Sequence, residues 1–176
     1  FNTLGALGWV SLSNQQKFIL MVPTEQNPTR QSFLHFNGST FDYNATRSEM
    51  DSVMNCALTS IGSKYNISKS HIYWAGFSEG ATFSAVAASV LGDKIRNFTM
   101  FAGAASPQLP VNTKKPMHFV VGTQDPSYND IVTIASQWQS DGFVVQKDSV
   151  NGVGHLLSGL TNSLGVQSIW QWMKNN

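Results

Sequence analysis

Short apolar runs alternate along the chain with stretches of helical periodicity. Continuous apolar runs of strand length, each bounded by Pro, Gly or polar residues, predict buried strands at residues 17–22, 71–75, 98–102, 117–122 and 143–149. The stretches between and after them predict helices over residues 46–65, 81–91, 129–140 and 164–174. Strands that alternate with helices imply right-handed crossovers, so we predict an α/β fold with a mostly parallel sheet covered by helices on both faces.

The first predicted helix follows a long loop over residues 23–45, which is rich in Pro, Asn, Thr and Gly. Thr46 and Glu49 have the spacing of a capping box and predict the start of the helix. Cys56, the only cysteine, falls among apolar positions of this helix, and we predict a small core residue there. Because one cysteine cannot form an internal disulfide, the alternative is a bond to a second chain.

Composition narrows the classes of function. The 176 residues suit one domain. With 11 Lys plus Arg against 10 Asp plus Glu the net charge is +1, so no basic excess favours nucleic-acid binding. No apolar run approaches the roughly 18 residues of a membrane span. The charged fraction of 12% is well below the ~25% typical of globular proteins, as is common in secreted proteins, and we expect an extracellular location.

Four sequons add an indication of secretion. Asn37, Asn44, Asn66 and Asn97 each begin an Asn-x-Ser/Thr triplet and are predicted glycosylation acceptors. The chain begins at Phe1 without an initiator Met, so we expect that an upstream segment has been removed. No Cys or His cluster has metal-ligand spacing, so neither a metal nor an organic cofactor is predicted.

A candidate nucleophile follows the predicted strand at residues 71–75. That strand runs into Gly76-Phe77-Ser78-Glu79-Gly80, and a helix is predicted to start at once. The pattern G-x-S-x-G between a strand and a helix is typical of a nucleophile elbow, in which a sharp turn exposes the serine hydroxyl. We expect glycines there because a Cβ at either position would clash with neighbouring elements. Ser78 is therefore the predicted nucleophile, beside a helix N-terminus that favours developing negative charge.

A serine nucleophile needs a base and, behind the base, a carboxylate. Asp125 follows the predicted strand 117–122, and His155 follows the predicted strand 143–149 on a glycine-rich loop. Both positions lie beyond the carboxyl ends of strands, where parallel sheets bind their ligands. The order serine, acid, histidine is the one that accompanies this kind of elbow. We therefore predict Asp125 as the acid and His155 as the general base.

Other residues compete for both roles. Asp130 lies at the predicted start of a helix and is more typical of a cap, and Asp148 lies inside a strand. Among the histidines, His118 lies within an apolar strand, and His71 opens the elbow strand at its far end. His35 lies on the long loop, where it could line a cleft.

Together these motifs resemble the α/β-hydrolase superfamily. From about residue 4 to the C-terminus the chain resembles the secreted esterases that include polyhydroxybutyrate depolymerases and feruloyl or acetylxylan esterases. The segments that carry this resemblance are FILMVPTEQ, SFLHF, KYNISKSHIYWAGFSEGA, FTMFAGA, HFVVGTQDPSYN and GVGH. The phospholipase/carboxylesterase and acyl-thioesterase group shares a similar elbow and is the nearest alternative. The resemblance implies the α/β-hydrolase fold and hydrolysis of esters.

The start of the chain departs from that family pattern. The secreted esterases have a His-Gly oxyanion loop after an earlier strand, and no such stretch precedes the apolar run at residues 17–22. We therefore expect residues 1–176 to be a single α/β-hydrolase domain that forms the C-terminal portion of a larger one and lacks the N-terminal strands and the oxyanion loop. A second chain could complete the domain. The one oxyanion donor that the sequence predicts is the backbone N–H of Glu79.

The expected activity is that of a serine esterase that forms an acyl-enzyme on Ser78 and acts outside the cell on a polyester or an esterified polysaccharide. Phe77, Leu156 and Leu157 are expected to wall an apolar substrate pocket, and Trp9 and the aromatic residues at 33–36 are further candidates. One alternative is a phospholipase/carboxylesterase-like or thioesterase-like hydrolase. Another is a weak or inactive hydrolase-fold glycoprotein with a binding role.

Overall fold

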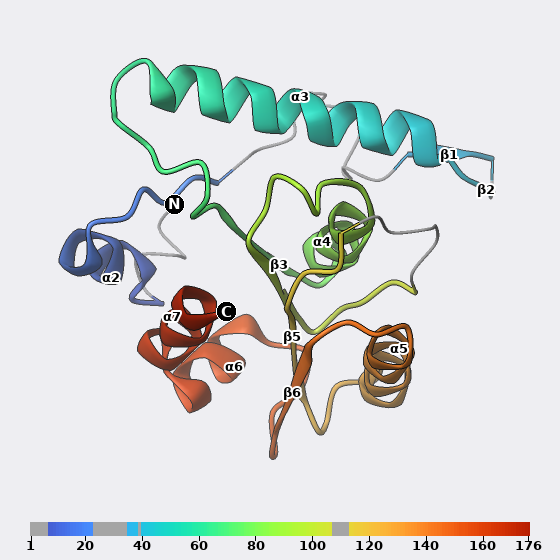
Figure 1. Ribbon diagram of the computed structural model, residues 1–176. Helices are drawn as coiled ribbons and strands as arrows, with labels where there is room; N and C mark the ends of the chain where they lie inside the picture. Colours follow the sequence, from blue (N-terminus) through green and yellow to red (C-terminus); the bar gives the residue numbers. More distant parts are fainter. Residues whose placement is uncertain (1–6, 23–34, 39, 107–112) are drawn as a thin grey trace.

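The computed structural model describes residues 7–22, 35–38, 40–106 and 113–176 (Figure 1). A parallel sheet of four strands lies at its centre, in the order β3 (Tyr73–Phe77), β4 (Asn97–Phe101), β5 (Met117–Gly122) and β6 (Val145–Val150). A short antiparallel pair, β1 (Phe36–Asn37) and β2 (Thr40–Phe41), forms a separate sheet. The predicted α/β fold with a mostly parallel sheet is confirmed.

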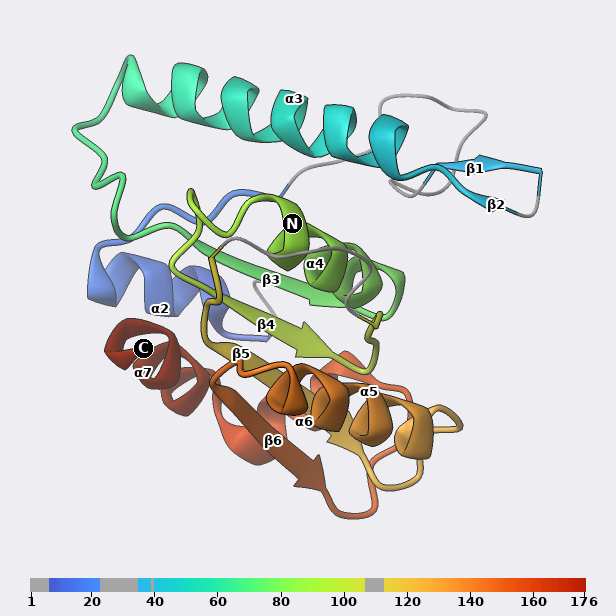
Figure 2. The same cartoon turned by 45° about the vertical axis from the view of Figure 1, so that its right-hand side comes forward.

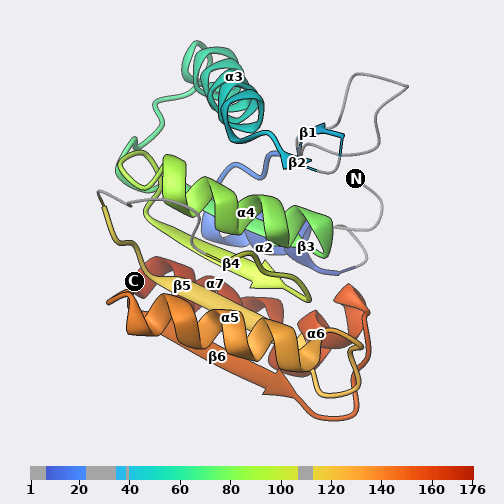
Figure 3. The ribbon, with the colours of Figure 1, turned by 90° about the vertical axis from the view of Figure 1, so that its right-hand side faces the viewer.

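Helices cover both faces of the central sheet (Figures 2 and 3). On one face pack α4 (Glu79–Val90) and α5 (Tyr128–Ser140), and on the other lie α2 (Trp9–Gln16), α6 (Leu157–Leu164) and α7 (Val166–Asn175). The longest helix, α3 (Tyr43–Gly62), lies outside α4 rather than on the sheet. Within the described ranges, no helix combines the length and apolar character needed to cross a bilayer.

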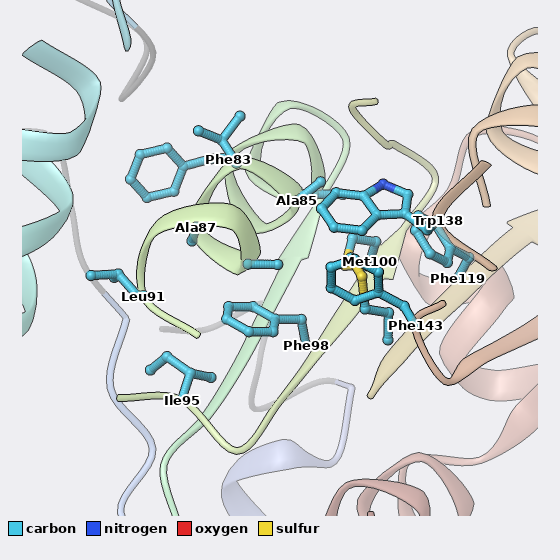
Figure 4. Packing of buried hydrophobic residues seen from close by; sticks show 14 of the residues in the cluster. Phe83, Ala85, Ala87, Leu91, Ile95, Phe98, Met100, Phe119, Trp138 and Phe143 are labelled. Carbon is cyan, nitrogen blue, oxygen red and sulfur yellow. The ribbon is translucent and has the colours of Figure 1, made fainter. Parts of the chain in front are cut away.

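Each face of the sheet has its own apolar cluster. Between the sheet and the helices α4 and α5, the side chains of Phe98, Met100 and Phe119 meet Trp138 and Phe143 (Figure 4). The second cluster lies under the helices of the opposite face and includes Val120, Leu160, Ile169 and Trp170. Because both faces are covered, every position of β4 and of β5 is buried, and most of their residues are apolar.

Most predicted elements are present. Four of the five predicted strands are observed to within two residues of their predicted bounds, and α4 and α5 match the predicted helices 81–91 and 129–140. The last predicted helix corresponds to α7, which a turn at Gly165 (φ 78°) separates from α6. No prediction covered α2 or α6, two eight-residue helices for which short sequence patterns carry little signal.

The predicted strand at residues 17–22 is wrong. Lys17 adopts a left-handed conformation (φ 59°) that ends α2, and residues 18–22 pair with no strand in the part of the chain that the structure describes. Phe18 and Leu20 pack against the second cluster, with the Phe18 ring stacked on Trp170 at 4.1 Å, whereas Ile19 and Met21 are exposed. The apolar run therefore half-buries two alternate side chains, as a strand at a surface does, without the backbone pairing that defines a strand.

The first long helix begins earlier than its predicted capping box. Its N-cap is Asp42, whose carboxylate accepts a hydrogen bond from Ala45 N–H at 3.0 Å. Thr46 lies buried inside α3, and its hydroxyl accepts a hydrogen bond from His35 N–H at 3.0 Å. An Asp three residues before Ala45 is itself a good N-cap, so the predicted capping box at Thr46 and Glu49 is wrong.

Cys56 is exposed, which contradicts its predicted place in the core. The buried face of α3 is narrow. Its buried apolar residues are Met50 and Met54, which lie one turn apart and pack in the same cluster as α4. Side chains two residues apart on a helix point about 200° apart around its axis. Cys56 therefore points away from the face of α3 that Met54 buries.

Asn97 is a poor glycan acceptor in the folded protein. It lies in the central strand β4 with no exposed surface, and its Nδ2 donates a hydrogen bond to Met173 O at 2.6 Å. A glycan on this nitrogen would displace α7 from the sheet, so the Asn97 prediction is corrected. Asn37, Asn44 and Asn66 are exposed, and they stay predicted acceptors.

A second buried polar residue, His118, also contacts α7 from the sheet. His118 in β5 is 2% exposed, its Nε2 donates to Asp148 Oδ2 at 2.7 Å, and its ring packs against Trp172 with centroids 4.7 Å apart. Burial lowers the pKa of His118 below its ordinary value of 6.5, although the hydrogen bond and the charge of Asp148 oppose that effect. The folded protein therefore resists protonation of this ring.

This resistance links stability to pH. Below about pH 6.5 the unfolded chain binds a proton that folded His118 does not, so we expect the free energy of unfolding to fall as the pH drops from there. His118→Gln should reduce this dependence when urea unfolding is followed between about pH 5 and pH 8. The matched control is His71→Gln, at an exposed ring, which should leave the dependence unchanged. Equal pH dependence in both variants would contradict the assignment to His118.

Candidate active site

Ser78 occupies the turn between the last residue of β3 and the first residue of α4. Its backbone is strained for a residue other than glycine, with φ 57° and ψ −118°. The N–H of Ser78 donates to Phe101 O in β4 at 2.8 Å, and its carbonyl accepts from Ala81 N at 3.0 Å and Thr82 N at 3.1 Å. Backbone contacts on both sides of the turn thus hold the serine at the carboxyl edge of the sheet.

The two glycines of the motif have different functions. A Cβ on Gly76 would lie 2.0 Å from Gly80 O and 2.6 Å from Ser84 Oγ, so only glycine lets α4 pack so closely on β3. A Cβ on Gly80 would meet no heavy atom within 4 Å. The predicted steric need for glycine is therefore confirmed at Gly76 and wrong at Gly80.

Asp125 lies just beyond β5, with its side chain fully buried. Its N–H donates to Gly122 O at 3.0 Å, and its Oδ1 accepts from Ser127 N–H at 2.9 Å. The second carboxylate oxygen, Oδ2, accepts from His155 Nδ1 at 2.8 Å. A buried carboxylate needs such donors, and these contacts also fix its orientation.

His155 lies on the loop between β6 and α6, and this loop packs on the end of β5. A Cβ on Gly122 would lie 2.0 Å from Val153 O, so the two segments are in backbone contact. Hydrogen bonds from Gln124 N to Val153 O at 2.9 Å and from Gly152 N to Thr123 Oγ1 at 3.0 Å join the two loops. The loop that carries His155 is therefore held against the loop that carries Asp125.

The structure brings the three predicted side chains together. His155 Nε2 lies 2.9 Å from Ser78 Oγ, at hydrogen-bond distance, although 77 residues separate them along the chain. Because Nδ1–H donates a hydrogen bond to Asp125, the lone pair of neutral His155 is on Nε2, where it can accept the hydroxyl proton of Ser78. The His155 side chain is 41% exposed, so a ligand can reach the outer end of this hydrogen-bonded chain.

The N-terminus of α4 begins at Glu79, directly after Ser78. The first N–H groups of a helix have no intrahelical acceptor, and the helix dipole makes this end positive. The Glu79 N–H therefore lies where it can donate to negative charge that develops beside Ser78 Oγ. The Glu79 side chain is exposed.

The competing candidates have other partners. His35 Nε2 pairs with Glu49, and the exposed His71 ring contacts the hydroxyls of Ser68 and Ser70. His118 pairs with Asp148 under α7. Asp130 lies exposed in the first turn of α5, where its charge favours the helix N-terminus, but the N-cap is Ser127, so the prediction of Asp130 as a cap is wrong.

The predicted apolar walls differ in their positions. The Phe77 ring lies beside His155, with centroids 5.1 Å apart, and Leu156, directly after His155, is 58% exposed. Leu157 is half-buried at the start of α6 and packs against the second cluster. Trp9 is buried in that cluster, so its predicted place in a pocket wall is wrong. Of the aromatic residues at 33–36, the one at position 33 lies outside the described residues.

Two contacts that support the site were not predicted. A Cβ on Gly103, after β4, would lie 2.3 Å from Ser78 O, so glycine lets this segment approach the turn. Nothing in the sequence near Gly103 reveals a contact with so distant a segment. Ser127 supplies the N–H that binds Asp125, and the sequence Asp-Pro-Ser, typical of a turn closed by an Asp side chain, could have indicated it.

Known structures with a similar fold include several esterases. The structure of esterase PE8 matches with a TM-score of 0.60 at 15% sequence identity, over 83% of this chain and 71% of that chain. The carboxylesterase from Mesorhizobium loti matches with a TM-score of 0.60 at 15% identity, over 86% and 71% of the two chains. The Bacillus cereus carboxylesterase matches with a TM-score of 0.57 at 17% identity, over 78% and 64%. No protein-family model and no curated protein sequence matches this chain.

The chain has the α/β-hydrolase fold. In this fold the nucleophile elbow, the acid and the histidine each follow a strand, in that order along the chain, and meet at the carboxyl edge of the sheet. Ser78, Asp125 and His155 follow β3, β5 and β6 in that manner. The expected fold is confirmed, and at this level of sequence identity the similarity concerns the fold.

A pair of alanine substitutions tests the close contact at the elbow. Gly76→Ala places a methyl group against a backbone oxygen of α4, and we expect it to lower the free energy of unfolding by more than about 3 kcal/mol. Gly80→Ala, in the first turn of the same helix, meets open space and should raise stability by up to about 1 kcal/mol. Urea unfolding measures both. Equal stability of the two variants would show that the elbow does not need the close approach.

Proposed function

We propose that this protein is a serine hydrolase that cleaves carboxylic esters. The observation that carries this proposal is the unbroken chain of hydrogen bonds from buried Asp125 through His155 to Ser78, with distances of 2.8 and 2.9 Å. This chain ends at the exposed edge of the sheet, beside the N-terminus of α4. In these positions Ser78 is the nucleophile, His155 the general base and Asp125 the group that orients and stabilises the histidine.

The geometry supports a two-step acyl transfer. Ser78 Oγ attacks the ester carbonyl carbon while its proton passes to His155 Nε2. The tetrahedral intermediate collapses when the leaving alkoxide takes that proton, which leaves the acyl group on Ser78. Water then attacks the acyl-enzyme, with His155 again as base, and releases the acid.

Two parts of the protein stabilise the charges that form. The Glu79 N–H and the positive end of α4 stabilise the oxyanion, and the Asp125 carboxylate stabilises the imidazolium. Asp125 can hold its charge while buried because Ser127 N–H and His155 both donate to it.

For the substrate we propose a bulky ester outside the cell, a polyester or an esterified polysaccharide. The open position of His155 and the exposed Leu156 support access by a large molecule, and Phe77 and Leu157 extend the apolar surface. The exposed sequons at Asn37, Asn44 and Asn66 are consistent with secretion. The alternative is a carboxylesterase for small esters, and two of the similar structures are carboxylesterases.

Labelling by a fluorophosphonate tests the nucleophile. We expect the probe to attach to Ser78, which peptide mass spectrometry identifies, and Ser78→Ala to abolish labelling. The matched control is Ser127→Ala, because the Ser127 hydroxyl is exposed and only its backbone contacts Asp125. Labelling that persists in Ser78→Ala would overturn the assignment.

Turnover separates the candidate functions. An esterase should release p-nitrophenol from a short-chain p-nitrophenyl ester, and Ser78→Ala should abolish that release. Release of acetate from acetylxylan or of soluble acid from a polyhydroxybutyrate film would support the polymer substrate. Turnover of small esters alone would favour the carboxylesterase, and folded protein without labelling or turnover would favour the binding role.

Two matched Asp-to-Asn substitutions test the role of Asp125. Asp125→Asn keeps the shape of the side chain but donates to Nδ1 rather than accepting from it, so we expect kcat to fall by about four orders of magnitude. Asp130→Asn, at an exposed position on α5, should stay within about twofold of the wild type, as expected for a surface change. Equal activity of the two variants would remove Asp125 from the proposed mechanism.

A further inference from the structure

The imidazole of His155 is restrained in its own plane by two hydrogen bonds. Asp125 Oδ2 binds Nδ1 and Ser78 Oγ contacts Nε2. Contacts in the ring plane resist rotation within that plane better than tilting of the ring out of it. Because the side chain is 41% exposed, some further contact is needed to hold the ring against tilting.

Phe77 provides a contact of this kind. Its ring centroid lies 5.1 Å from that of His155, with the two planes inclined by 43°. Phe77 is itself well held, because its backbone pairs with Phe101 in β4 and its side chain packs against the second apolar cluster. The Phe77 ring therefore contacts both the apolar cluster, which limits its motion, and the imidazole of His155.

The electrostatics of this contact change during the reaction. The face of an aromatic ring is negative, and it attracts a cation within about 6 Å of the ring centroid. His155 is neutral before Ser78 attacks and becomes a cation as it takes the proton. An interaction that strengthens as the cation forms lowers the barrier rather than merely tightening ground-state binding.

We infer that Phe77 is a positioning residue that holds the His155 ring and stabilises its protonated form through the π-electrons of its own ring. This inference rests on the proposed function, and it assigns to the residue before the nucleophile a role in proton transfer in addition to its place beside the substrate. The motif thus supplies both the nucleophile, Ser78, and a support for its base.

The pH dependence of labelling distinguishes this role from a purely structural one. The second-order rate of labelling by a small fluorophosphonate is measured from about pH 5 to pH 9, which needs no knowledge of the natural ester. In Phe77→Leu the protonated imidazole loses its aromatic support, so we expect the acidic limb of the profile to move to lower pH by about 0.4–0.7 pH unit. The limiting rate at high pH should fall about two- to fivefold. Phe77→Tyr keeps the ring and should restore the wild-type profile.

Tyr73→Leu is the matched control. Tyr73 lies in the same strand and packs in the same apolar cluster, but its ring contacts Trp170, at 5.3 Å, rather than His155. Its loss should lower stability without moving the pH profile. Should Phe77→Leu fail to fold, Phe77→Met provides an apolar replacement of similar length for the same measurement.

The outcomes separate the inference from the proposed function. If the wild type is labelled at Ser78 and Phe77→Leu has the wild-type pH profile, the inference is overturned while the proposed nucleophile stands. A shift that is equal in Tyr73→Leu would likewise overturn it, because the cause would then be general loosening of the cluster. A wild type that is not labelled at Ser78 would overturn both.

Discussion

The backbone turn at Ser78 is the constraint on which the rest of the site depends. A residue other than glycine in this conformation is unfavourable by about 1–3 kcal/mol, so the surrounding structure must hold it. The contacts that do so come from the backbone: Phe101 O binds the Ser78 N–H, and the absence of a side chain at Gly76 and at Gly103 lets α4 and the segment after β4 close around the turn. With the turn held in this way, the hydroxyl lies at the edge of the sheet and the positive end of α4 lies beside it.

Three histidines of this chain pair with a carboxylate, and their surroundings decide what each pair can do. His118 with Asp148 is buried under α7, and there burial disfavours the charged ring. His35 with Glu49 joins the segment before β1 to α3. Only His155, with Asp125, has a serine hydroxyl at its second nitrogen within the described residues. The same two residue types therefore support packing in two places and, in the proposed mechanism, proton transfer in the third.

Burial falls from the acid to the histidine of the proposed proton-transfer chain. The Asp125 side chain is inaccessible to water, the His155 side chain is 41% exposed, and Ser78 is half-buried. A carboxylate in a low-dielectric site interacts more strongly with the imidazolium than one in water would. An open histidine, in turn, lets an ester and then a water molecule reach Nε2. The gradient thus combines a strong electrostatic support with access for substrate.

The sequence alone determined the elements whose residues are buried on several sides and the turns that follow them. β4, β5 and α4 are largely buried segments rich in apolar residues, and Ser78, Asp125 and His155 each follow a strand end, where chain direction restricts their positions. Local pattern was therefore sufficient to name three residues that the fold brings together. It was not sufficient at residues 17–22 or Cys56, because an apolar residue is compatible with a strand, a coil or a half-exposed helix until its neighbours are known.

Only the tertiary structure decided which contacts hold the site. It showed that Gly76, but not Gly80, must lack a side chain, that Gly103 approaches Ser78, and that the ring of Phe77 lies beside His155. Each of these facts concerns the distance between atoms on different segments, and the sequence of either segment carries no record of that distance. The local sequence specified the reactive groups, and the packing of strands, helices and loops against one another specified their geometry.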